Sequence, residues 1–104
     1  MAKTAVIAKI TAADGRRADL VAELAKMFPQ VETEDGTELY VLHEDIGEAN
    51  VVWFYELYTD MEALGVHSGS EAMAALMGSL SGDLVGAPPV LSILNPIGAK
   101  GVDL

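Results

Sequence analysis

The chain has no cysteine and few basic residues. The absence of cysteine excludes disulfides, thiolate nucleophiles, iron–sulfur clusters and the usual structural zinc sites, so the fold must rest on packing alone. Six lysines and arginines stand against sixteen aspartates and glutamates, which gives a net charge of -10. Nucleic acid and anionic membranes both attract proteins with basic surfaces, so neither is an expected partner.

Long apolar runs are also missing, although the composition as a whole is apolar. Hydrophobic residues make up 51% of the 104 residues, yet no uninterrupted apolar stretch approaches the ~20 residues of a membrane span. Lys9 interrupts the first apolar run before a signal-peptide core can form, which predicts a cytoplasmic protein. The surplus of apolar side chains indicates an interface between subunits.

The spacing of apolar residues predicts one domain, residues 1–104, with a loose tail from about residue 96. Alternating or β-branched runs predict four strands, at Thr4–Thr11, Thr37–Asp45, Val51–Tyr58 and Val90–Leu94. The order of elements is then β-α-β-β-α-β. It predicts an α+β, ferredoxin-like fold, in which an antiparallel sheet carries both helices on one face.

Two helical regions separate these strands. The first is predicted to begin at Arg16, after an N-cap at Asp14-Gly15, and to stop before Pro29. The second is predicted in two parts. Asp60 caps a short turn through Leu64, and Ser70 caps a longer stretch that ends at Gly82.

The strand Val51–Tyr58 is apolar on both faces. Because side chains alternate along a strand, Trp53 and Tyr55 face one way, and Phe54, Glu56 and Tyr58 face the other. Two helices cover only one side of the sheet. The simplest cover for the other side is a second copy of the sheet, which predicts a dimeric α+β barrel with Trp53 and Tyr55 in the interface.

The candidate site lies on the Glu56 face of this strand. A carboxylate in an apolar strand needs a partner or a raised pKa, and His67 is the predicted partner of Glu56. Phe54, Tyr58 and Tyr40 are predicted to line the pocket around this pair. The alternative is a buried pair that only fixes a helix against the sheet.

A second group of polar residues surrounds the hairpin turn, namely His43, Glu44, Asp45 and Glu48. Imidazole and carboxylate together are typical of metal sites. Strand alternation separates Glu44 from the other strand residues, however, and Glu48 lies in the turn. No metal is therefore predicted, and the group is interpreted as a solvated hairpin end.

Three segments together resemble the antibiotic biosynthesis monooxygenase domain family. They are Glu34-Asp35-Gly36 with Tyr40, then Phe54-Tyr55-Glu56-Leu57-Tyr58-Thr59-Asp60, then Ala63-Leu64 with His67 and Ser70. The resemblance covers nearly the whole chain and implies a dimeric α+β barrel. The family includes cofactor-independent quinol or polyketide monooxygenases, haem-degrading enzymes and a signal-molecule isomerase.

The resemblance implies an oxidoreductase, a cofactor-independent monooxygenase that acts on a small electron-rich aromatic and dioxygen. His67 would be the base and Glu56 its orienting group, in a homodimer or higher oligomer without cofactor. Haem is not expected, because the first strand has no asparagine, Tyr58 stands where the haem-degrading members have tryptophan, and Ala74 and Ala75 replace a helix histidine. A non-catalytic ligand-binding or stress-related dimer and a proton-transfer isomerase remain alternatives.

Overall fold

The computed structural model describes residues 2–104. Four strands form one sheet in the order β2-β3-β1-β4, and every neighbouring pair is antiparallel. The strands are β1 (Thr4–Thr11), β2 (Thr37–Glu44), β3 (Val51–Tyr58) and β4 (Val90–Leu94). The helices are α1 (Arg17–Leu24), α2 (Phe28–Val31), α3 (Met61–Ser68) and α4 (Glu71–Ser79), and a 3-10 turn, η1 (Ala25–Met27), joins the first two.

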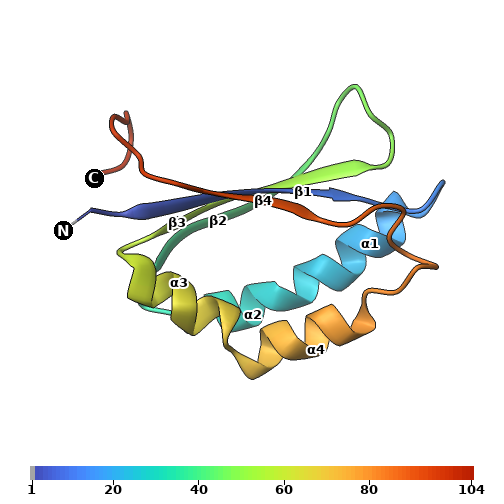
Figure 1. Ribbon diagram of the computed structural model, residues 1–104, viewed down its shortest axis with the longest axis horizontal. Coiled ribbons are helices and arrows are strands. Elements are labelled where there is room, and N and C mark those ends of the chain that lie inside the picture. Colours follow the sequence, from blue (N-terminus) through green and yellow to red (C-terminus); the bar gives the residue numbers. More distant parts are fainter. Residues whose placement is uncertain (1) are drawn as a thin grey trace.

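All the helices lie on one face of the sheet (Figure 1). This arrangement confirms the α+β, ferredoxin-like fold predicted from the order of elements. Three of the predicted strands, β1, β3 and β4, have the predicted bounds, and β2 ends one residue earlier than predicted. Over residues 2–104, none of the helices has both the length and the apolar character needed to cross a bilayer.

The helix ends differ from the prediction. Helical structure continues past Pro29, because this proline lies in the first turn of α2, where its missing N–H has no intrahelical partner to lose. Arg16, without a side-chain cap, precedes α1, while the Asp14 carboxylate accepts a bond from Asn50 instead. The helix α3 runs on to Ser68, and α4 already ends at Ser79.

Two helix starts follow the prediction. The Asp60 carboxylate accepts a hydrogen bond from the backbone N–H of Ala63 at 2.8 Å. The Ser70 hydroxyl oxygen accepts one from the N–H of Met73 at 3.1 Å. Each side chain satisfies a donor that the first turn of a helix leaves free, so α3 and α4 begin at fixed positions.

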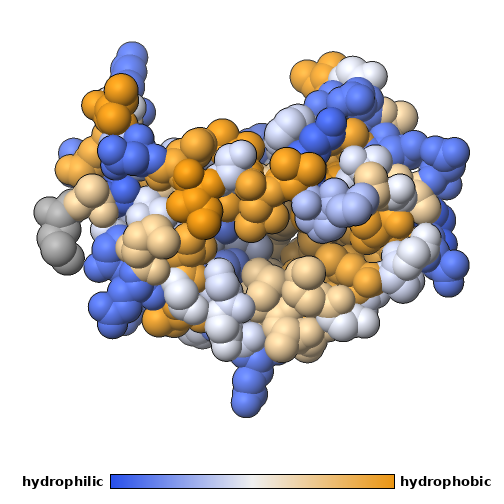
Figure 2. All heavy atoms as spheres, in the orientation of Figure 1, coloured by the Kyte–Doolittle hydropathy of each residue, from blue (hydrophilic) through white to orange (hydrophobic). Residues whose placement is uncertain are grey.

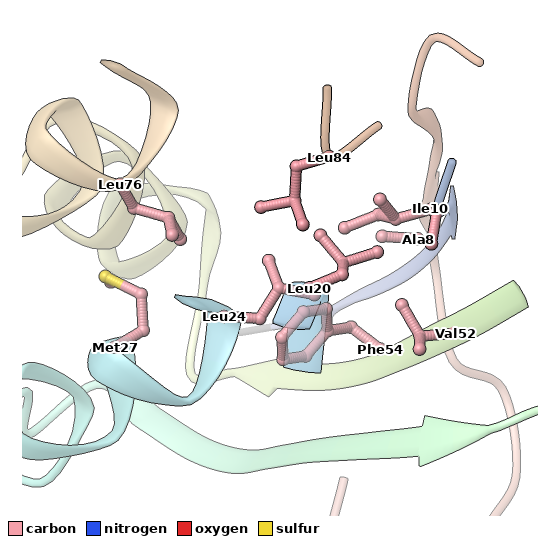
Figure 3. Close-up of a cluster of buried hydrophobic side chains, with 10 residues drawn as sticks. Ala8, Ile10, Leu20, Leu24, Met27, Val52, Phe54, Leu76 and Leu84 are labelled. Atoms are coloured by element: carbon pink, nitrogen blue, oxygen red, sulfur yellow. The ribbon is translucent and has the colours of Figure 1, made fainter. Parts of the chain in front are cut away.

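The main core lies between the sheet and the pair α1 and α4. Figure 3 shows its side chains meeting from both layers, with Leu76 and Met27 facing one another across the helices. Burying such aliphatic and aromatic side chains stabilises the fold by roughly 1.5–3 kcal/mol for each of them. The buried members of this cluster are Ala8, Ile10, Ala12, Leu20, Leu24, Met27, Val52, Phe54, Leu76 and Leu84.

The opposite face of the sheet carries no helix. The hairpin loop between β2 and β3 and the C-terminal tail both rise on this side, at opposite ends of the sheet (Figure 1). The tail has no helix or strand after Leu94, and the Lys3 ammonium donates to the carbonyl oxygen of Asp103. Figure 2 shows apolar side chains along the β4 edge, where Val90 and Leu91 are about 60% exposed.

One close backbone approach positions the segment before β2 against α3. A Cβ atom added to Gly36 would lie 2.4 Å from the Cβ of Ala63, which is inside van der Waals contact. The carbonyl oxygen of Gly36 also accepts the N–H of Thr59 at 2.9 Å. Only glycine therefore allows this segment to pack directly on the first turns of α3.

We expect Gly36→Ala to lower the free energy of unfolding by about 1–3 kcal/mol, because the added methyl group forces the two segments apart. Gly78→Ala is the matched control. No atom lies within 4 Å of its added Cβ, and it is in α4, so this change should stabilise the protein by about 0.5–1 kcal/mol. Urea denaturation measures both. Equal stability of the two variants would contradict the packing argument.

Candidate functional site

A cavity of about 210 Å³ lies between the sheet and the helices. Its wall is apolar except for Tyr40, Glu56, His67 and Ser68. Leu91 of β4 and Met77 of α4 line it and are both more than half exposed, so the cavity opens between these two elements. The apolar part of the lining consists of Val6, Ala8, Ile10, Leu24, Phe54, Leu64, Met73, Leu76, Met77, Leu80, Pro89 and Leu91.

A larger hollow, of about 640 Å³, lies elsewhere, beside Arg16 and Asp83. Most of its lining side chains are polar or charged, and its Arg16 is already bonded to Asp19. No buried ionisable group lines it. Since a site for a small molecule usually combines an apolar enclosure with a few polar groups, the smaller cavity is the better candidate.

His67 is buried in the last turn of α3. Its Nδ1 atom lies 2.8 Å from Oε1 of Glu34, in the segment between α2 and β2. Glu34 also accepts bonds from Gln30 Nε2 at 2.9 Å and Thr37 Oγ1 at 2.8 Å. Burial alone would raise the pKa of Glu34, but the bonds from Gln30, His67 and Thr37 together lower it.

An ionised Glu34 fixes the state of the histidine ring. Because a carboxylate can only accept, Nδ1 of His67 must carry the proton. The other ring nitrogen, Nε2, is buried and has no hydrogen-bond partner among residues 2–104. His67 lines the cavity, and in the neutral ring Nε2 presents a lone pair. This is the arrangement of a general base whose tautomer is set by a carboxylate behind it.

Glu56 has a different partner from the one predicted. Its Oε1 atom accepts a hydrogen bond of 2.5 Å from the Tyr58 hydroxyl, and no hydrogen bond joins it to His67. The predicted pairing of Glu56 with His67 is therefore wrong, since Glu34 holds that ring. Burial raises the pKa of Glu56, and the nearby Glu34 charge adds to the rise, while the Tyr58 bond and His67 oppose it.

Aromatic rings surround the histidine. The Tyr40 ring centroid lies 5.1 Å from that of His67 and 4.8 Å from that of Phe54. Tyr40 and Phe54 both line the cavity, as predicted, but Tyr58 does not. Tyr58 is fully buried, donates its hydroxyl to Glu56, and has its ring centroid 5.5 Å from that of His67. Burial, followed by the charges of Glu56 and Glu34, raises the pKa of the Tyr40 hydroxyl, which keeps it protonated.

Trp53 and Tyr55 lie on the opposite face of β3 from this cavity, in agreement with the strand alternation. The indole Nε1 of Trp53 donates to Oδ2 of Asp45 at 2.8 Å. The other carboxylate oxygen of Asp45 accepts the N–H groups of Gly47 and Glu48. Both carboxylate oxygens of Asp45 are thus occupied by hydrogen bonds at the hairpin. Within residues 2–104, no three histidine, aspartate or glutamate side chains lie close enough together to hold a metal ion.

Glu34, Gln30 and Thr37 were not predicted as parts of the site, although Glu34 belongs to the Glu34-Asp35-Gly36 segment of the family resemblance. Gln30 and Glu34 are four residues apart, a spacing that brings side chains together on a helical turn. That signal predicts their mutual bond. It does not predict the contact of Glu34 with His67, which is 33 residues further along and depends on how α3 packs against the segment before β2.

The sequence matches the antibiotic biosynthesis monooxygenase family over residues 4–78, a span that includes Glu34, Glu56 and His67. The chain belongs to this family. It is similar to Rv0793 from Mycobacterium tuberculosis, with 27% identity over 95% of this chain and 99% of that chain, at a TM-score of 0.85.

Two further solved structures share the fold of this chain. PA3566 from Pseudomonas aeruginosa is 24% identical over 94% of this chain and 97% of that chain, with a TM-score of 0.83. SO0527 from Shewanella oneidensis is 22% identical over 91% of each chain, with a TM-score of 0.85. Among curated proteins, none has a sequence that matches this chain.

We expect Glu34→Ala to lower the free energy of unfolding by about 2–3 kcal/mol at pH 7, because it leaves the buried His67 and the partly buried Gln30 and Thr37 without their acceptor. The folded-state pKa of Glu34 is lowered, so its contribution is complete above the ordinary carboxyl pKa of about 4.3 and is lost as the pH falls through the folded-state value. The difference from wild type should therefore shrink toward pH 3.

Urea denaturation at several pH values measures this difference. Glu32→Ala is the control, since Glu32 is an exposed neighbour whose side chain makes no hydrogen bond or ion pair within residues 2–104. This variant should match wild type throughout. A Glu34→Ala penalty that stays constant from pH 7 to pH 3 would contradict an ionised, hydrogen-bonded Glu34.

Proposed function

We propose that this protein is a cofactor-independent monooxygenase that acts on a small electron-rich aromatic, a quinol or a polyketide-type phenol. Its membership of the antibiotic biosynthesis monooxygenase family supports this class of reaction. The observation that carries the proposal is the buried, unpartnered Nε2 of His67 at an apolar cavity. A base in such a place acts on a hydroxyl group that an apolar ligand brings to it.

The cavity limits the size of the ligand. At the packing density of protein interiors, about 0.74, a volume of 210 Å³ holds roughly 155 Å³ of ligand atoms. This is the size of a single ring with substituents or a small two-ring compound. Tyr40 and Phe54 offer their rings to such a ligand, and the aliphatic wall excludes a highly charged one.

The proposed chemistry starts with a proton. The O–H bond of the quinol breaks, and its proton forms a bond with Nε2 of His67. The resulting aryloxide is electron-rich and transfers an electron to dioxygen, after which carbon and oxygen combine. Cleavage of the O–O bond leaves one oxygen atom on the ring and releases the other as water. One quinol and one dioxygen give one hydroxyquinone and one water, and the substrate supplies all four electrons.

Glu34 is a positioning residue in this scheme. It holds Nδ1 of His67 and so keeps the lone pair of Nε2 on the ligand side. Its negative charge also stabilises the imidazolium that forms when the ring takes the proton, as the carboxylate does in a triad. The apolar wall keeps water from the aryloxide, so the charge that develops there is met by fixed groups of the protein.

We expect His67→Gln to reduce oxygen uptake with quinols by at least about 10²-fold, the usual contribution of a general base. Glutamine can still donate to Glu34, so the variant should fold. His43→Ala is the control, because this second histidine is exposed on β2, and it should retain full activity. An oxygen electrode with a panel of quinols measures both. Unchanged uptake in His67→Gln would refute the assignment of the base.

A second copy of the chain is the proposed cover for the open face of the sheet. The residues of this face from β2, β3 and β4 include Val41, Trp53, Tyr55, Val90 and Leu94. Val41 is 41% exposed and Val90 is 60% exposed. A row of exposed apolar side chains on a sheet marks an interaction surface. Two such faces packed together would form the dimeric α+β barrel expected from the sequence.

We expect Val41→Lys to weaken dimerisation by at least tenfold, because the ammonium group would be buried against the partner sheet. Val66→Lys is the control, since Val66 is 60% exposed but belongs to α3, on the helix side. Sedimentation velocity over a range of concentrations measures the dimer. A monomeric wild-type protein, or a dimer that Val41→Lys leaves intact, would rule out this interface.

A further inference from the structure

Glu56 is a buried carboxyl group that the proposed reaction does not yet use. It lines the cavity, and one of its oxygens, Oε1, accepts the Tyr58 hydroxyl. No hydrogen bond to its other oxygen, Oε2, occurs within residues 2–104. The lysine and arginine ion pairs in the same range all involve other carboxylates. Among the described residues, no lysine or arginine therefore pairs with Glu56 to stabilise a negative charge.

Four groups face Glu56 from the elements around it. They are Tyr58 on its own strand, Tyr40 on β2, Glu34 in the segment before β2, and His67 on α3. Both tyrosines are neutral, and Glu34 carries the one fixed charge, which is negative. Burial, with the Glu34 charge, raises the pKa of Glu56 despite the opposing Tyr58 hydrogen bond and His67, so the net effect of the surroundings is against its ionisation.

One proton of the site could be held either by the Glu56 carboxyl group or by Nε2 of His67. If Glu56 gave it to His67 Nε2, a second carboxylate and an imidazolium would face an apolar cavity, and the new N–H would have no acceptor. Creating a further pair of opposite charges in a low-dielectric site, with the new N–H unpaired, is unfavourable. The proton therefore belongs on Oε2 of Glu56, in the way that an apolar site keeps the catalytic carboxylic acid of ketosteroid isomerase neutral.

We propose that Glu56 is a neutral carboxylic acid that donates a hydrogen bond from Oε2 to a ligand carbonyl, opposite the accepting Nε2 of His67. The natural ligand is then a hydroxy-carbonyl compound in which the two groups are conjugated. This inference rests on the proposed function for the role of His67 as the proton acceptor. It adds the second ligand group that the cavity recognises.

The two groups act on one conjugated system. The ligand O–H bond breaks and its proton bonds to Nε2 of His67, while the electron pair that remains spreads over the ring to the carbonyl oxygen. Negative charge grows on that oxygen, and the hydrogen bond from Glu56 strengthens with it. No electron leaves the ligand in this step. A ligand with a hydroxyl alone would leave the Glu56 donor without a partner.

Two ligands of nearly equal size separate these cases. Both 4-hydroxyacetophenone and 4-ethylphenol have one ring and one phenolic hydroxyl, but only the first has a conjugated carbonyl. Calorimetric titration at pH 6, where both are uncharged, and without dioxygen, measures binding alone. We expect wild type to bind the ketone about tenfold more tightly, the effect of one buried hydrogen bond that would otherwise be left unmade.

Variants of Glu56 test the direction of the hydrogen bond. Glu56→Gln keeps a donor, because its amide N–H replaces the carboxylic O–H, and should retain the tenfold preference. Glu56→Met has a similar length and no donor, and should lose it while still binding 4-ethylphenol, which also shows that it is folded. Glu62→Gln, at an exposed position of α3, is the control and should match wild type.

Three results would overturn the proposal. The first is a wild-type protein that binds neither ligand, and the second is a preference for the ketone that survives in Glu56→Met. The third is a preference for the ketone that appears only in Glu56→Gln, because this result would mean that Glu56 is ionised in the wild-type protein. Failure of the monooxygenase proposal would give a result that differs from these three. Oxygen uptake would then be absent, while the ketone preference measured without dioxygen persisted.

Discussion

The hydrogen bond between Glu34 and His67 is the contact on which the site depends. It joins the segment before β2 to the last turn of α3, two parts of the chain 33 residues apart. It also decides which ring nitrogen carries the proton, so that Nε2 presents a lone pair rather than an N–H group to the cavity. Gln30 and Thr37 support this bond, because each donates to Glu34 and favours its ionised form against the effect of burial.

The strand β3 serves the two faces of the sheet in different ways. Its Phe54 and Glu56 side chains form part of the cavity, while Trp53 and Tyr55 lie on the open face. The two faces are separated by one backbone layer. Neighbouring side chains along this strand therefore belong to different environments, and Trp53 is fixed by Asp45 at the hairpin rather than by the site.

Much of the architecture followed from local patterns. Alternation and β-branched residues were sufficient for the bounds of β1 and β4, and the caps at Asp60 and Ser70 followed from residue type. The course of the chain at Pro29 did not follow, because a proline breaks a helix interior but is tolerated in a first turn. The 3-10 turn η1 ends the first helical segment before Pro29, so the proline falls in the first turn of α2 and not in a helix interior.

The site was harder to predict than the fold. Tyr40, Phe54, Glu56 and His67 were recognised as cavity residues from strand faces and residue type. Their partners were not, since Glu56 bonds a residue two positions away on its own strand, whereas His67 bonds a distant loop. Strand alternation places side chains on faces. It does not fix which of several polar groups on one face will pair.

One side of the cavity opening belongs to a different part of the chain from the polar groups of the cavity. Leu91 and Pro89 lie beyond residues 4–78, the span that matches the family, whereas Glu34, Glu56 and His67 lie within it. Substitutions between α4 and β4 can therefore reshape this side of the opening without moving Glu34, Glu56 or His67. The shape of the opening and the arrangement of the polar interior can thus change independently of one another.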